Sequence, residues 1–259
     1  MKKASIAAVL LWVWAGHAQA IGGLADVTVY DRAEGRVLPL HYHEGRYYVV
    51  GKPGNEYQIN VRNNQPGEVL AVVSVDGVNA VSGETANWSQ TGYVLASNAS
   101  FGIMGWRKSL QRVAAFFFTE LENSYAVRTG RPDNVGVIGV AIFRKKPAPV
   151  VGIVQQAEPW RDVPAAPRER QQSGHPGNAD ANAMQRPSVV EKSLGTGHGQ
   201  SQMSVVRATS FERATPTPEE VITIYYDSYR SLVAQGVIRD VTRIARPNPF
   251  PGQFVPDPQ

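Results

Sequence analysis

A proline-rich segment, residues 147–202, divides the chain into two parts that are both rich in apolar residues. The segment has seven prolines among Gln, Ser, Asn and Gly, and Trp160 is its only aromatic residue. This composition cannot bury enough apolar surface to offset the entropy lost on ordering, so we predict a disordered insert. Residues 203–245 are too short to form a core alone. We therefore expect them to complete the sheets that residues 21–146 begin. Residues 246–259 are a proline-rich tail.

The part before the insert has the pattern of strands. Residues 57–62 alternate between apolar and polar, which indicates a strand with one face toward solvent. The run Val69–Val75 is almost entirely apolar and predicts a central strand covered on both faces. Asp76-Gly77 follows, and this pair is typical of a two-residue hairpin turn with positive φ at both positions. Further strands are expected at Ala25–Asp31, Val37–His43, Tyr47–Val50, Val78–Val81, Tyr93–Leu95, Phe101–Trp106, Val113–Phe118 and Val135–Phe143.

After the insert we expect strands at Ser204–Glu212 and Val221–Tyr226. Ser228–Gln235 has a helical pattern, and Gly236 can close that helix in the left-handed conformation. A second short helix is expected around Leu121–Thr129. The sequence thus predicts a mainly β fold, an antiparallel β-sandwich with one or two short helices and a long disordered insert.

The first twenty residues have the three parts of an export signal. Met1–Lys3 is positively charged, residues 4–16 are apolar and uncharged, and residues 18–20 place small side chains where signal peptidase cleaves. The apolar run is shorter than the roughly 20 residues that a membrane span needs. We predict a signal peptide at 1–20, a periplasmic or secreted chain that starts at Ile21, and no transmembrane span after cleavage.

Composition excludes several classes of function. The chain has no Cys, which excludes disulfides, a thiol nucleophile, iron–sulfur clusters and cysteine-based zinc sites. The formal charge is +4, and removal of the two lysines of the signal leaves 4 − 2 = +2. Such a small charge argues against binding to nucleic acid. No cofactor is expected, and the expected partner is an unknown ligand or protein of the envelope.

Five motifs stand out as a set: VLAVVSVDGVN (Val69–Asn79), GWRKS (Gly105–Ser109), TGRPDNVGVIGVAIF (Thr129–Phe143), SFERA (Ser210–Ala214) and YYDSY (Tyr225–Tyr229). As a set they resemble an uncharacterised family of secreted bacterial proteins. The resemblance covers most of residues 33–145 and 195–238 and skips the proline-rich insert. It implies an exported single domain, and it supplies no reaction, ligand or catalytic residue.

The strongest candidate for binding is the group Trp106, Arg107, Lys108 and Arg112. An aromatic ring beside three cations could stack on a sugar or hold a carboxylate or phosphate. The alternative is a strand end with solvated charges and Trp106 packed inside. Arg131 and Asp133 precede the apolar strand at Val135–Phe143. They are either further binding residues or fasten their loop by an ion pair and turn hydrogen bonds.

Two metal sites are weaker candidates. His41 and His43 lie two residues apart, so on a strand both imidazoles share one face and could bind Zn²⁺ or Cu²⁺ with a third ligand. The alternative is an exposed hairpin face. Asp76, Asn79 and Glu84 offer oxygen ligands for Ca²⁺, although a turn explains Asp-Gly equally well.

Known hydrolase motifs are absent from the sequence, which lacks Gly-x-Ser-x-Gly and His-Glu-x-x-His. Glu212 and Asp227 could form a catalytic carboxylate pair on adjacent strands, or one of them could pair with Arg213. We expect a non-enzymatic envelope binding or interaction module, with a hydrolase of an envelope glycan or peptide as the alternative. A metal carrier that uses the two histidines is a third possibility.

Overall fold

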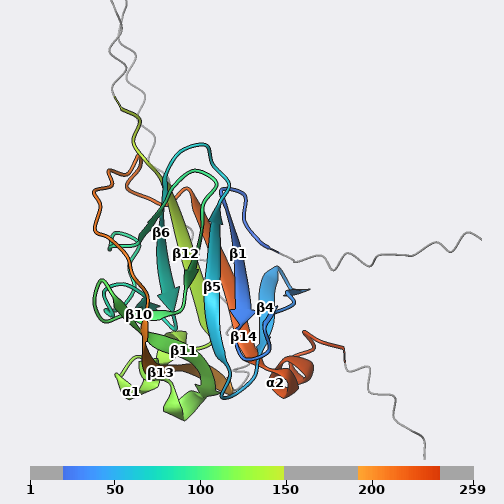
Figure 1. The fold of residues 1–259 in the computed structure, drawn as a ribbon. Coiled ribbons are helices and arrows are strands. Elements are labelled where there is room, and N and C mark those ends of the chain that lie inside the picture. The colour runs from blue at the N-terminus through green and yellow to red at the C-terminus, as the bar shows by residue number, and fades with distance from the viewer. Residues whose placement is uncertain (1–19, 149–191, 240–259) are drawn as a thin grey trace, which may run out of the picture.

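The computed structural model describes residues 20–148 and 192–239. Its strands form two seven-stranded sheets that pack face to face (Figure 1). Sheet A contains β1 (Ala25–Asp31), β2 (Arg36–Val37), β5 (Glu56–Asn63), β9 (Ser100–Ile103), β10 (Gly105–Arg107), β11 (Arg112–Glu120) and β13 (Leu194–Met203). Sheet B contains β3 (His41–His43), β4 (Arg46–Gly51), β6 (Val69–Val75), β7 (Val78–Asn79), β8 (Tyr93–Leu95), β12 (Val137–Arg144) and β14 (Glu220–Ser228). The predicted β-sandwich is confirmed.

Most neighbouring strands are antiparallel, and one pair is parallel. Sheet A has the order β10-β11-β5-β1-β2, with β13 also on β11 and β9 also on β5. Sheet B has the order β3-β4-β14-β12-β6-β7, with β8 also on β6. The parallel pair is β14 with β4. Of the two strands that follow residues 149–191, β13 therefore joins sheet A and β14 lies within sheet B.

The burial of the strands follows their sequence patterns. In β1, residues at alternate positions from Ala25 are buried, and β5 shows the same alternation. In β6 nearly every residue is buried, because both of its faces are covered. Val73 and Val75 belong to the core between the sheets, whereas Leu70 packs with Phe143 in a second cluster on the outer face.

The predicted end of the insert at residue 202 is wrong, because β13 occupies Leu194–Met203. The glycines of β13 suggest a loop by composition, but a larger residue would not fit beside the neighbouring strand. A Cβ at Gly197 would overlap the ring of Phe117 on β11. The strand expected at Ser204–Glu212 is not formed. Residues 1–19 of the predicted signal, residues 149–191 of the predicted insert and residues 240–259 with the tail lie outside the described residues.

The short helices agree with the predictions. A 3₁₀ helix, η1 (Leu121–Asn123), is followed by α1 (Tyr125–Arg128), and a second 3₁₀ turn, η2 (Pro132–Asn134), leads into β12. The helix α2 (Tyr229–Ala234) starts at Ser228, whose hydroxyl accepts a hydrogen bond from the Ser231 amide. Gly236 has φ +75° just after this helix, as the sequence predicts.

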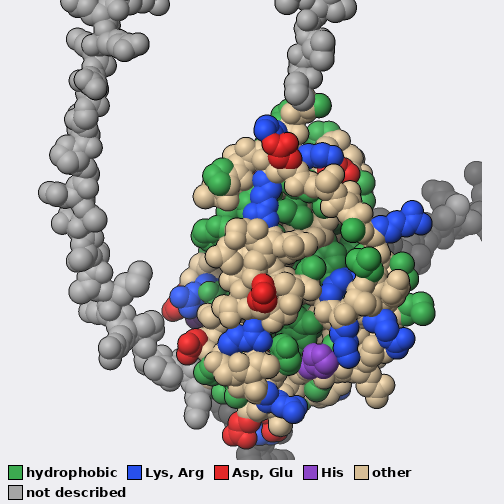
Figure 2. Space-filling view, turned by 90° about the vertical axis from the view of Figure 1, so that its left-hand side faces the viewer, with side chains coloured by type: hydrophobic (Ala, Val, Ile, Leu, Met, Phe, Trp, Pro, Cys, Tyr) green, Lys and Arg blue, Asp and Glu red, His purple; other side chains and the backbone are tan. Residues whose placement is uncertain are grey.

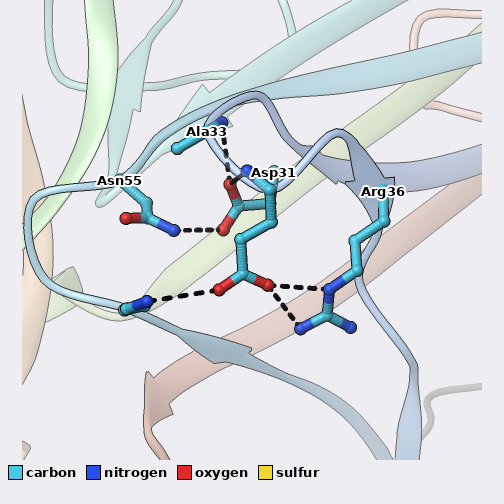
Figure 3. Close-up of polar contacts among 6 residues, drawn as sticks. Asp31, Ala33, Arg36 and Asn55 are labelled. Carbon is cyan, nitrogen blue, oxygen red and sulfur yellow. Dashed lines mark hydrogen bonds and ion pairs between the residues drawn. The ribbon is translucent and has the colours of Figure 1, made fainter.

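Buried carboxylates fix two turns. Asp31 closes the turn between β1 and β2, where it accepts hydrogen bonds from the amides of Ala33 and Glu34 and from the side chain of Asn55 (Figure 3). Asp76 begins the turn between β6 and β7, with φ +52°, and Gly77 has φ +72°. These two angles agree with the predicted hairpin turn.

Asp76 also joins both sheets in the core. Its carboxylate accepts hydrogen bonds from the Gly136 amide at 2.9 Å, the Thr196 amide at 2.8 Å and the Tyr226 hydroxyl at 2.5 Å. The Thr196 hydroxyl lies 2.6 Å from the hydroxyls of both Tyr226 and Tyr57. A continuous polar chain thus links the turn after β6 to β13, β14 and β5.

Replacement of Asp76 by Ala should destabilise the fold strongly. The Asp76→Ala variant leaves two amides and one hydroxyl without their acceptor, and each unsatisfied buried group costs about 1–3 kcal/mol. We expect the free energy of unfolding to fall by about 3 kcal/mol or more, measured by urea denaturation. Asp133→Ala, which removes an exposed aspartate, is the control and should change stability by less than about 0.5 kcal/mol.

The stability that depends on Asp76 should also change with pH. Burial raises the pKa of Asp76 from 3.8 to about 6, and the hydrogen bonds that it accepts oppose part of this rise. Between pH 6 and 4 the folded chain therefore binds a proton that the unfolded chain has lost, so this group stabilises the fold as pH falls through that window. We expect the unfolding free energy of the wild type, relative to that of Asp76→Asn, to increase by about 2 kcal/mol from pH 7 to pH 4. A difference that stays constant with pH would contradict this assignment.

Candidate ligand-binding pocket

A pocket of about 450 Å³ opens along one edge of the sandwich. β8 of sheet B forms one wall, β9 of sheet A forms another, and the segment 204–209 covers the opening between them. The pocket thus lies where the two sheets separate. In Figure 1 this segment is the orange chain at the left of the molecule.

Apolar side chains form most of the pocket wall. Tyr93 of β8 is buried, and its ring lies 5.4 Å from the ring of Phe101 of β9. Val81 and Leu95 also line the wall. The register of β8 on β6 places Tyr93 and Leu95 on the same side of the strand. The strand alternation therefore directs both side chains toward the space between the sheets.

The rim of the pocket is apolar and exposed. Leu110 is 51% exposed and Val205 is 63% exposed, and both line the opening. Met203, at the end of β13 just before the covering segment, is 72% exposed. Exposed apolar side chains that gather at a cavity mark a site of interaction more often than scattered ones.

Arg107 holds the covering segment in place. Its guanidinium donates to the Ser204 carbonyl at 2.7 Å and to the Ser204 hydroxyl at 2.8 Å. It also donates to the Tyr93 hydroxyl at 3.3 Å, with its central carbon 5.6 Å from the centre of that ring. The Val206 amide bonds to the Leu110 carbonyl at 2.8 Å. These bonds fix the segment over the pocket.

The charges around the pocket are all positive. Arg107 and Arg207 line it, and no Asp or Glu is among its described lining residues. Arg207 is exposed, and its side chain makes no hydrogen bond or ion pair within residues 20–148 and 192–239.

Burial raises the pKa of Tyr93, and the charge of Arg107 opposes part of that rise. The Tyr93 hydroxyl therefore stays neutral at physiological pH.

Figure 2 shows this side of the molecule, where Lys and Arg side chains are spread over the surface with hydrophobic side chains between them. Of the four residues predicted as a binding group, Trp106, Arg107, Lys108 and Arg112, Arg107 alone is among the described lining residues of the pocket. Trp106 is 3% exposed and packs edge-to-face on Phe116, so the alternative interpretation of a buried tryptophan is correct. The indole N–H of Trp106 has no hydrogen-bond partner within the described residues.

The remaining basic residues of that group lie outside the pocket. Lys108 is exposed, and Arg112 donates to the Ser201 hydroxyl at 2.9 Å. Arg131 donates to the Gly83 carbonyl at 3.1 Å and lies over the ring of Tyr125. It thus fastens its loop, but the described residues record no ion pair between Arg131 and Asp133.

Neither metal candidate forms a ligand set among the residues that the structure describes. His41 and His43 share the outer face of β3, and the described part of the chain contains no group of three His, Asp or Glu side chains that could bind a metal ion. Asp76 is directed into the core and its oxygens are occupied. The Asn79 side chain bonds to the Val81 amide and to Gln90. The proposed calcium loop is therefore a structural turn.

Glu212 and Asp227 do not form a carboxylate pair, which was one of the two possibilities that the sequence left open. Glu212 pairs with Lys146, just beyond the last residue of β12. Asp227 lies beyond the opposite end of β12, because Tyr225 pairs with Val137, the first residue of that strand. It accepts hydrogen bonds from the hydroxyls of Ser193 and Ser231, both at 2.6 Å. The length of β12 separates the two carboxylates.

Comparison with known proteins identified no relative. No protein-family model matches the chain, and neither the curated proteins nor the solved structures include a match. The resemblance to secreted bacterial proteins therefore stays a prediction.

Loss of the Arg107 side chain should release the covering segment. In an Arg107→Gln variant the Ser204 carbonyl and hydroxyl lose a charged donor, and hydrogen bonds to charged groups contribute about 1.5–3 kcal/mol. We expect amide hydrogen exchange at Val206 to become at least about tenfold faster, a change of about 1.4 kcal/mol in local opening. Lys108→Gln removes the neighbouring exposed cation and should leave that exchange rate unchanged. Equal exchange in the two variants would show that Arg107 does not hold the segment.

Proposed function

We propose that the chain is an exported, non-enzymatic binding module that takes an amphipathic molecule, with an apolar body and an anionic head group. The observation that carries this proposal is the composition of the pocket wall, which is apolar and includes two arginines and no described carboxylate. Its volume of about 450 Å³ lies in the range of small-molecule sites.

The two arginines have different roles in this proposal. Arg107 is fixed by its bonds to Ser204 and Tyr93, so it contributes a stationary positive charge at the wall. Arg207 is exposed and has no partner in the described residues, so its guanidinium is available to a carboxylate or phosphate at the pocket entrance. The body of the ligand would then contact the apolar wall around Phe101 and Leu95.

The predicted export signal supports an envelope location for this ligand. The envelope contains acyl chains that end in carboxylate or phosphate groups, and both head groups share the chemistry that arginine binds. In the described ranges, none of the helices is long and apolar enough to cross a membrane. The lining supports binding rather than hydrolysis, because its described residues include no His, Asp or Glu that would activate a nucleophile or water.

A calorimetric titration with matched ligands tests the proposal. Dodecanoate and dodecyl phosphate carry the anionic head, dodecanol is the neutral control of equal chain length, and acetate is the anion without an apolar body. We expect both long-chain anions to bind at least about tenfold more tightly than dodecanol, and acetate not to bind. Equal binding of dodecanol would remove the role of the arginines, and no binding of any long-chain compound would refute the proposed function.

Arg207→Ala should weaken the binding of dodecanoate about tenfold, which corresponds to about 1.4 kcal/mol. The physical reason is the loss of a pocket cation whose side chain has no bond to break within residues 20–148 and 192–239. Lys108→Ala is the control, since Lys108 is an exposed cation of the same face that does not line the pocket. If both variants weaken binding equally, general surface charge rather than Arg207 attracts the ligand.

A further inference from the structure

A second set of aromatic side chains lies on the outer face of sheet B, away from the pocket between β8 and β9. Tyr225 of β14 is in register with Tyr48 of β4, and Tyr48 is in register with His41 of β3. Residues in register share a face of the sheet, and the neighbouring Val49 and Ile224 face the core. The three side chains therefore form a row across the outer surface.

The row is partly exposed, and a cation lies over one of its rings. Tyr48 and Tyr225 are half-buried, and their ring centres are 5.5 Å apart. The guanidinium of Arg46 lies 5.4 Å from the centre of the Tyr225 ring. No described segment covers these rings as Phe211 covers the outer cluster around Phe143 in the same sheet.

A cavity of about 490 Å³ opens beside this row. Tyr48 and Tyr225 line one side, and Leu232 of α2 and Gln235, the residue just after that helix, line another. Figure 1 shows α2 beside the ends of β4 and β14, the two strands that carry these tyrosines. The cavity thus has an aromatic wall and a wall that carries an amide.

The charges that line this cavity are balanced. Arg46 and Lys192 are positive, and Glu44 and Asp227 are negative. Lys192 uses one donor on the Val135 carbonyl at 2.7 Å, and its ammonium has three donors in all. The Gln235 amide nitrogen bonds to Asp227, while its carbonyl oxygen has no recorded partner within the described residues. Donors and acceptors are both available.

We propose that this cavity is a second binding site, which takes a neutral oligosaccharide. The C–H faces of a pyranose ring can pack on the tyrosine rings, which are apolar on the face and polar at the tip. Sugar hydroxyls both donate and accept hydrogen bonds, so they match the mixed lining. The balanced charge favours an uncharged ligand over the anion proposed for the pocket with Arg107 and Arg207. This site stands independently of the proposed function.

Titration of the full chain with a tetramer of N-acetylglucosamine and with a neutral glucose tetramer, followed by NMR chemical-shift changes, tests this site. We expect at least one oligosaccharide to shift resonances of β4, β14 and α2. The Tyr225→Thr variant keeps a strand-forming residue and removes the ring, so binding should weaken at least tenfold. Tyr225→Phe keeps the ring and should retain binding.

The control is Tyr229→Ala, which removes an exposed tyrosine of α2 that does not line this cavity. It should leave oligosaccharide binding unchanged. Tyr225→Thr should still bind dodecanoate if the pocket between β8 and β9 works as proposed, so the two sites can fail separately. The site is refuted if neither oligosaccharide binds at millimolar concentration, or if Tyr225→Thr binds as wild type does.

Discussion

The buried carboxylate of Asp76 connects parts of the chain that are far apart in sequence. Its partner amide at Thr196 is 120 residues away, and its partner hydroxyl at Tyr226 is 150 residues away. Both partners come after Pro187, the last proline of the proline-rich segment, so the turn after β6 helps to fix where β13 and β14 join the sheets. β13 leads into the segment that covers the pocket, and β14 carries Tyr225. Both candidate sites therefore depend on this interaction.

The sequence predicted those features of the fold that depend on residues close together in the chain. Alternation predicted β1 and β5, Asp76-Gly77 predicted a turn with positive φ, and Gly236 predicted the end of α2. β13 could not be predicted in this way, because its glycines meet the ring of Phe117 on a strand that is about 80 residues earlier in the chain. Composition alone assigns such a strand to a loop, and only the identity of its neighbour explains it.

The candidate site was only partly predictable for the same reason. An aromatic residue next to cations drew attention to Trp106 and Arg107, and strand alternation then directs one inward and the other outward. Both of their partners on β11, Ala114 and Val113, are buried, so the pairing alone does not decide which one points inward. The contact that buries Trp106 is its packing on Phe116. Tyr93 and Val205 gave no signal in the sequence, because the pocket exists only where their two distant segments meet.

Charged side chains in this fold differ in whether their polar atoms already have hydrogen-bond partners within the protein. This difference separates side chains that stabilise the fold from those that can bind a ligand. The charged side chains of Asp31, Asp76 and Arg131 form hydrogen bonds with backbone groups of turns and loops, so they stabilise the fold. Within the described residues the Arg207 side chain makes no hydrogen bond or ion pair, and the Lys192 ammonium donates one hydrogen bond. A charged side chain with free capacity at a cavity gains more from a ligand than one that must first break internal bonds. This difference, more than residue type or proximity in sequence, identifies which cations of the chain are available for binding.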